Sequence, residues 1–161
     1  KILNLGNKYN IVKIKRLNKN TSTKFASTES VIDDLLKQLN LEFDNFVLMQ
    51  VTSPLRKIDT IKKFYNYCIK NDINKCLTVS EIHDNISPKN KYFRLNQTAR
   101  RSQDRKIYIQ ENGLLYFCKK KSYLKTRSIY SKKKWNYFIT DKYESIDINN
   151  LNDYRIAKKI F

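Results

Sequence analysis

Four polar side chains follow one apolar run of the sequence, and their chemistry suits a polar, anionic ligand. They come directly after residues 46–49 and are Gln50, Thr52, Ser53 and Arg56. The amide and the hydroxyls can donate and accept hydrogen bonds, and the guanidinium offers a planar fork for carboxylate or phosphate. In open α/β sheets, ligands collect at the carboxyl ends of strands. The pattern predicts the lip of a binding site, although a capped turn between a strand and a helix has the same composition.

The cysteines and the histidine do not indicate metal or covalent chemistry. Cys68, Cys76 and Cys118 are far apart and form no C-x-x-C pair. We expect them to be small buried apolar residues in a reducing cytoplasm. His83 is the single histidine, and no serine-elbow or cysteine context accompanies it, so a catalytic triad is disfavoured.

The net charge of +18 raises the question of nucleic-acid binding. However, Lys far outnumbers Arg in this sequence. Asn and Ile are also abundant, and this composition is typical of proteins from AT-rich genomes. The lysine runs 119–121 and 132–134 are typical of solvated faces, and no nucleic-acid recognition motif is present, so a nucleic-acid partner is disfavoured. A positive surface also attracts anionic small molecules. No apolar run approaches the length of a membrane span, and we expect no membrane partner.

Hydrophobic periodicity predicts strands that alternate with helices around the polar cluster. Residues 11–15 alternate like an edge strand. Residues 45–49 are apolar after Asn45, like a central parallel strand covered on both faces. A further strand is predicted at 75–79. Between these strands, Asp59 stands at the start of a helix, because acidic residues favour the first turn. The side chains expected on the inner side of that helix are Ile61, Phe64, Tyr65, Cys68 and Ile69.

The first helix is predicted to begin at Ser27 and Thr28, which fit an N-cap, and to end at Asn40. Residues 80–111 are irregular and predict an excursion from the main sheet. Gly113 then opens a strand over 114–118, where a turn with positive φ is expected. A final helix carries the apolar residues Leu151, Tyr154, Ala157 and Ile160. The 161 residues are expected to form a single domain.

Three motifs occur in a fixed order: Q-V-T-S-P-L-R, R-R-S-Q-D followed by Y-I-Q-E-N-G-L-L-Y-F, and E-S-I-D-I-N-N-L-N-D. Together they resemble the CMP-sialic acid synthetases, or acylneuraminate cytidylyltransferases, whose usual forms are Q-P-T-S-P-L-R, R-R-Q-D-L-P with Y and N-G-x-x-Y, and S-I-D-I-D-x-x-x-D. The resemblance covers about residues 25–161. It implies an α/β, Rossmann-like nucleotidyltransferase with three αβα layers, a mostly parallel sheet, and a dimerisation excursion at 80–111.

The resemblance also implies an activity and its partners. CMP would pass from CTP to a nine-carbon 2-keto sugar acid, such as a sialic or legionaminic acid, with release of pyrophosphate. The anomeric hydroxyl would attack the α-phosphorus in line, so catalysis would consist mainly of positioning and of charge neutralisation by Mg²⁺. The protein would be a cytoplasmic homodimer. A non-catalytic sugar-binding or assembly protein derived from the same fold is the alternative.

The resemblance assigns the roles of the family's site residues to the positions of this sequence that match the motifs. Arg101 and Asp147 are the expected catalytic residues, and Asp147 and Asn149 the expected metal ligands. Arg100 or Arg101, with Gln103, would neutralise the sugar carboxylate. The remaining expected substrate contacts are Gln50, Thr52, Ser53, Arg56, Tyr108, Asn112 and Tyr116.

The sequence departs from the family pattern at three places. Val51 replaces a proline, which should alter only the stiffness of the turn. Asn149 replaces the second metal aspartate, and its amide oxygen is a weaker Mg²⁺ ligand than a carboxylate. The family's first strand and its R-x-G-S-K phosphate loop are not found in the 161 residues. We therefore expect the 161-residue chain alone to release no pyrophosphate from CTP.

Overall fold

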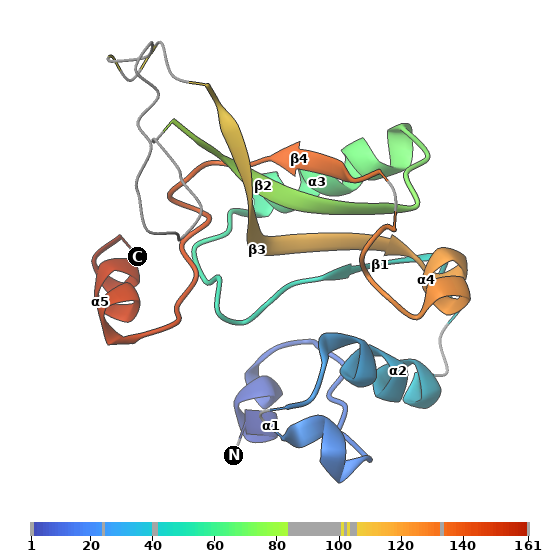
Figure 1. The fold of residues 1–161 in the computed structure, drawn as a ribbon. Coiled ribbons are helices and arrows are strands. Elements are labelled where there is room, and N and C mark those ends of the chain that lie inside the picture. The colour runs from blue at the N-terminus through green and yellow to red at the C-terminus, as the bar shows by residue number, and fades with distance from the viewer. Residues whose placement is uncertain are drawn as a thin grey trace.

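The computed structural model shows a mixed α/β arrangement built on a four-stranded sheet (Figure 1). Its strands are β1 (Asn45–Leu48), β2 (Lys75–Ile82), β3 (Tyr108–Lys119) and β4 (Asn136–Ile139). The helices are α1 (Ile2–Leu5), α2 (Thr28–Gln38), α3 (Ile58–Lys70), α4 (Lys120–Thr126) and α5 (Leu151–Ile160), with 3-10 turns at Gly6–Lys8 and Lys19–Ser22. The structure describes residues 2–23, 25–39, 42–83, 101, 103, 106–132 and 134–160.

The strand pairings differ from the predicted mostly parallel sheet. The order is β1-β3-β2-β4, and β3 runs antiparallel to both of its neighbours, so only the β2–β4 pairing is parallel among the described strands. β1 lies at one edge of this sheet rather than at its centre. The apolar run at 45–49 predicted the strand correctly but not its place, because hydrophobicity reports burial and not the direction of a partner strand.

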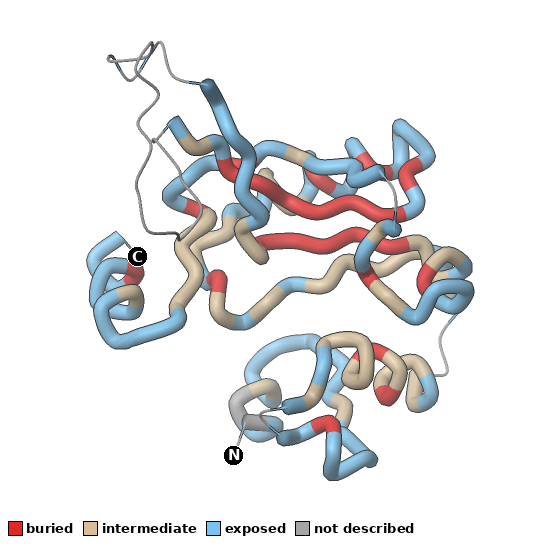
Figure 2. Tube along the Cα trace, viewed as in Figure 1, coloured by how far each residue is buried: buried red, intermediate tan, exposed pale blue. Residues whose placement is uncertain are grey.

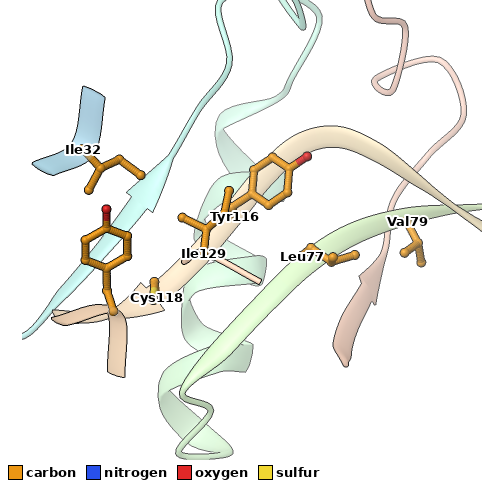
Figure 3. Packing of buried hydrophobic residues seen from close by; sticks show 7 residues of the cluster. Ile32, Leu77, Val79, Tyr116, Cys118 and Ile129 are labelled. Atoms are coloured by element: carbon orange, nitrogen blue, oxygen red, sulfur yellow. The ribbon is translucent and has the colours of Figure 1, made fainter. Parts of the chain in front are cut away.

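Buried residues follow the central strands β2 and β3 (Figure 2), and they form two clusters, one on each face of the sheet. One joins α3 to the sheet through Phe64 and Cys68, which pack with Phe117 and Leu114. The other contains the residues drawn in Figure 3 and joins α2 and α4 to the sheet. Its members are Ile32, Leu77, Val79, Tyr116, Cys118, Tyr123 and Ile129. The central strands β2 and β3 are therefore fixed from both faces.

The predicted helices are confirmed, but the predicted buried faces hold only in part. Ser27 caps α2, since its hydroxyl accepts a hydrogen bond from the Ser30 amide at 3.1 Å. On α3, Phe64 and Cys68 are fully buried, whereas Tyr65 is 41% exposed. α5 forms as predicted, but Ala157 is its only buried residue among those described.

Two other expectations need correction. Residues 11–15 form no strand, and Val12 is 72% exposed. A run of five alternating residues makes a strand only where a partner strand is available. Both ends of the excursion predicted at 80–111 belong to the sheet instead, because β2 and β3 stay paired as far as Ile82 and Tyr108. Residues 84–100 lie outside the described residues, so the predicted dimer contact there stays a prediction.

The cysteines are free and buried, as predicted. Burial raises the pKa of the Cys118 thiol to about 11, which makes it a poor nucleophile at neutral pH. Among the described residues, no helix is long and apolar enough to cross a membrane.

Candidate functional site

An irregularity in β3 shapes the floor of the candidate site. The β2–β3 register shifts between Leu77 and Val79, so that residues 112–115 of β3 lie opposite Thr78 alone. Gly113 has φ of 71°, which confirms the predicted positive φ, although it lies within β3 rather than at its start. A Cβ at this position would lie 3.7 Å from Gln50 Oε1 and 4.0 Å from the Tyr116 hydroxyl. Glycine therefore permits the turn, and the missing Cβ leaves both groups without a contact from this position.

A cavity of about 830 Å³ opens above this floor. It lies between the bulge in β3, the end of β1 and the loop that precedes α5. Of the predicted site residues, it brings together Gln50, Asn112, Tyr116, Asp147 and Asn149. Lys142 is the one cationic side chain among the described residues that line it. The cavity is thus polar, with hydrogen-bonding groups from segments that are far apart in the chain.

Asn112, half-buried at the cavity, is the centre of a hydrogen-bond network that extends into the sheet. Its Oδ1 accepts from Thr78 Oγ1 at 2.7 Å and from the Leu114 amide at 3.2 Å. Its Nδ2 lies within 2.9 Å of three hydroxyl oxygens, those of Ser80, Thr140 and Ser145. The amide therefore ties β2, the bulge in β3 and the loop after β4 together, and it fixes the geometry of the cavity floor.

Thr52, Ser53 and Arg56 do not line the cavity among the described residues. The Thr52 carbonyl accepts a hydrogen bond from the Ile148 amide at 2.8 Å, and the Arg56 guanidinium donates to the Gln50 carbonyl. Burial lowers the pKa of Arg56. Ser53 is fully buried. The backbone bonds fit the capped-turn interpretation of the motif. The Ser53 hydroxyl and Arg56 Nε are buried with no hydrogen-bond partner among the described residues, and the substrate roles predicted for the three residues stay predictions.

The loop before α5 places one carboxylate at the cavity. Asp147 Oδ2 accepts from Asn149 Nδ2 at 3.0 Å, while Asp147 Oδ1 is buried with no hydrogen-bond partner among the described residues. Asp153 is occupied elsewhere, because its Oδ2 accepts from the amides of Asn149 and Asn150 at 2.9 and 3.1 Å. Those bonds cap the N-terminus of α5. The described residues contain no group of three or more His, Cys, Asp or Glu side chains arranged for a metal.

The basic motif is not brought to the cavity by the described residues. Arg101 and Gln103 are exposed, and neither lines it. Tyr108 is 39% exposed, and the Lys106 ammonium lies 5.7 Å from the centre of its ring. Arg100 lies outside the described residues. The roles predicted for these four residues stay predictions.

Glu144 is a structural residue of the site loop that the sequence did not reveal. It is 4% exposed, and its carboxylate accepts from the Lys57 amide at 3.0 Å and from Thr60 Oγ1 at 2.9 Å. Lys57 itself makes no side-chain cap at the start of α3. Glu144 therefore caps α3 from 87 residues away and fixes the loop that carries Asp147.

Removal of this cap should destabilise the fold. We expect Glu144→Ala to lower the free energy of unfolding by about 2–3 kcal/mol, because two donors lose a charged acceptor in a buried place. Asp59→Ala is the matched control, since Asp59 is an exposed acid in the same first turn of α3, and it should cost less than about 1 kcal/mol. Urea denaturation followed by circular dichroism measures the free energy of unfolding of both variants. Equal losses in the two would contradict the assignment of Glu144 as the cap of α3.

Comparison with known proteins supports the resemblance found in the motifs. No family model matches the chain. Curated N-acylneuraminate cytidylyltransferases of Streptococcus agalactiae serotypes III, Ia and V are each 26% identical to it in a 141-residue alignment that covers 83% of this chain. The resemblance is confirmed: the chain is similar to N-acylneuraminate cytidylyltransferases over most of its length. It spans 34% of the length of these relatives.

Proposed function

We propose that this chain supplies the sugar-acid pocket of a Rossmann-like cytidylyltransferase. The reaction transfers CMP from CTP to a nine-carbon 2-keto sugar acid and releases pyrophosphate. The observation that carries the proposal is the convergence of Gln50, Asn112, Tyr116 and Asp147 on one polar cavity, from three motifs that are far apart in the sequence. The similarity to N-acylneuraminate cytidylyltransferases supports the same reaction.

The described residues can hold and orient a polyhydroxylated acid. The Gln50 amide and the Tyr116 hydroxyl both lie near Gly113 at the cavity, where a sugar hydroxyl or amide group can hydrogen-bond to them. Lys142 provides a positive charge at the wall of the cavity. Arg100 and Arg101 are proposed for the sugar carboxylate, by their place in the motif. Holding the anomeric hydroxyl in line with the α-phosphorus then provides most of the rate enhancement.

Asp147 fits a role as a ligand to Mg²⁺, and Asn149 fits it less well. The buried, unpartnered Oδ1 of Asp147 is an oxygen donor of the kind that Mg²⁺ prefers. Asn149 presents its Nδ2 to Asp147, so its amide must rotate before its oxygen can join the same ion. When bound, Mg²⁺ neutralises the charge of the triphosphate.

Restoring a carboxylate at position 149 should therefore strengthen Mg²⁺ binding. In the complete product of the gene that encodes this chain, we expect Asn149→Asp to lower the Mg²⁺ concentration for half-maximal rate by about threefold to tenfold. Asn152→Asp is the matched control, because it adds the same charge on α5 at a position that does not line the cavity. Initial rates over a Mg²⁺ series measure the effect, and coincident curves for wild type and Asn149→Asp would remove Asn149 from the metal site.

A non-catalytic sugar-binding or assembly protein of the same fold is the second candidate. The neutral amide at Asn149 favours it, because one fewer carboxylate faces the triphosphate. For the cytidylyltransferase we also propose a homodimer in the cytoplasm, as the family resemblance implies. The buried free cysteines agree with a reducing compartment.

Product formation separates the two candidates. The complete gene product is incubated with CTP, Mg²⁺ and a panel of sialic and legionaminic acids, and the CMP-sugar is detected by anion-exchange chromatography. Glucuronic acid is the control, because it has a carboxylate without the 2-keto group. We expect a CMP-sugar with at least one acid of the panel and none with glucuronic acid. Sugar-acid binding without product would favour the second candidate, and neither binding nor product would overturn both.

A further inference from the structure

Glu111 lines the cavity and is not among the residues that the motifs predicted. It stands on β3 directly before Asn112, opposite Val79 of β2. Its Oε1 accepts hydrogen bonds from two phenols, Tyr116 and Tyr130, the second at 3.2 Å. One carboxylate oxygen thus accepts a hydrogen bond from the hydroxyl of each tyrosine.

The two tyrosines differ in their position relative to the cavity. Tyr116 is 4% exposed, its ring belongs to the buried cluster, and its hydroxyl oxygen points out of that cluster (Figure 3). That hydroxyl lies beside Gly113, and so does the Gln50 side-chain oxygen: a Cβ on Gly113 would be 4.0 Å from the first and 3.7 Å from the second. Tyr130 packs edge-on against Tyr116 with ring centroids 6.1 Å apart, and it does not line the cavity.

A phenol has a single proton to donate. When Tyr116 donates that proton to Glu111, its oxygen can only accept from a third group. Burial and the neighbouring Glu111 carboxylate also raise the pKa of Tyr116, so the hydroxyl stays protonated and the arrangement persists through the neutral range. The face that Tyr116 presents to the cavity is therefore an acceptor.

We propose that Glu111 is a positioning residue that fixes Tyr116 as a hydrogen-bond acceptor, so that the pocket selects sugar acids with an O–H or N–H donor at the Gly113 floor. The inference rests on the proposed function, and it specifies the chemistry that the pocket requires of its ligand. A merely repulsive role for Glu111 would have the opposite effect, since loss of its negative charge would then tighten the binding of an anionic sugar acid.

A double-mutant cycle on sugar-acid binding tests the proposal. Calorimetry measures the dissociation constant of N-acetylneuraminic acid for the complete gene product and for Glu111→Ala, Tyr116→Phe and the double variant. We expect each single change to weaken binding about threefold to tenfold, which corresponds to one hydrogen bond. The double variant should bind no more weakly than Tyr116→Phe, because Glu111 acts through the Tyr116 hydroxyl.

Two further variants separate positioning from general damage. Glu111→Gln should bind about as well as wild type, because its amide oxygen still accepts from Tyr116. Tyr130→Phe removes the other phenol from the same carboxylate and should change the affinity less than twofold. If the wild type binds the sugar acid and Glu111→Ala binds it equally or more tightly, the positioning role is overturned and the proposed function stands. Additive effects of the two substitutions on binding would have the same consequence. No binding by wild type to any acid of the panel would overturn the proposed function and this inference with it.

Discussion

We expect Asp147→Ala in the complete gene product to abolish the proposed CMP transfer, with a loss of at least about 100-fold in kcat. The reason is that Asp147 is the one carboxylate of the S-I-D-I-N turn at the cavity wall, and Asp153 cannot substitute while it caps α5. The folded state should not suffer, because Asp147 Oδ1 is buried without a partner among the described residues. Removing such a group costs little or relieves a desolvation penalty.

The matched control is Asp141→Ala. Asp141 is an exposed acid in the same loop, and it accepts from the Tyr143 amide but does not line the cavity. Its loss should change kcat less than about threefold. Pyrophosphate release and urea denaturation are measured for both variants. A catalytic loss shared equally by Asp141→Ala, or accompanied by a large loss of stability in Asp147→Ala, would remove the metal-ligand role.

Asn112→Leu should produce the largest loss of stability among single substitutions at the site, about 3–4 kcal/mol. The leucine fills a similar volume but leaves the Ser80 hydroxyl and the Leu114 amide without the Asn112 groups that pair them. The Thr78 hydroxyl loses its bond to Asn112 and keeps those to the Leu115 backbone. Each buried polar group that loses its partner costs about 1–3 kcal/mol, and rotation of the hydroxyls recovers part of that sum. The cavity floor should loosen as well, so sugar-acid binding should weaken.

Asn136→Leu serves as the control for this substitution. Asn136 is exposed, and its side chain makes one hydrogen bond, to the Lys75 carbonyl at 3.3 Å. It should cost less than about 1 kcal/mol. Urea titrations that give the same midpoint for Asn112→Leu and wild type would show that the network contributes nothing to folding.

The sequence predicted most of the elements because their signals are local. The Ser27 cap, the helical spacing up to Leu39 and the apolar run at 45–49 each depend on neighbours within a few residues. The positive φ of Gly113 was also predictable, because few residues other than glycine adopt it. The order and direction of the strands were not, since apolar runs report burial without naming the partner strand.

The candidate site divides in the same way. Gln50, Asn112, Tyr116 and Asp147 could be predicted because they stand in recognisable motifs, and the structure brings them to one cavity, where their roles stay predictions. Thr52, Ser53 and Arg56 share a motif with Gln50 but do not line that cavity among the described residues. Glu111 and Glu144 were missed because their contacts are made with side chains and amides that no local pattern associates with them.

The most direct test of the sugar-acid pocket is to locate the bound ligand. ¹⁵N-labelled protein is titrated with N-acetylneuraminic acid, and amide chemical shifts are followed by NMR. We predict saturable shifts at Gln50, Gly113 and Asp147, which surround the cavity, and none at Asp44 or Lys120, which line a separate cavity of about 810 Å³. Shifts confined to the second cavity, or no saturable shifts at all, would contradict the assignment of this site.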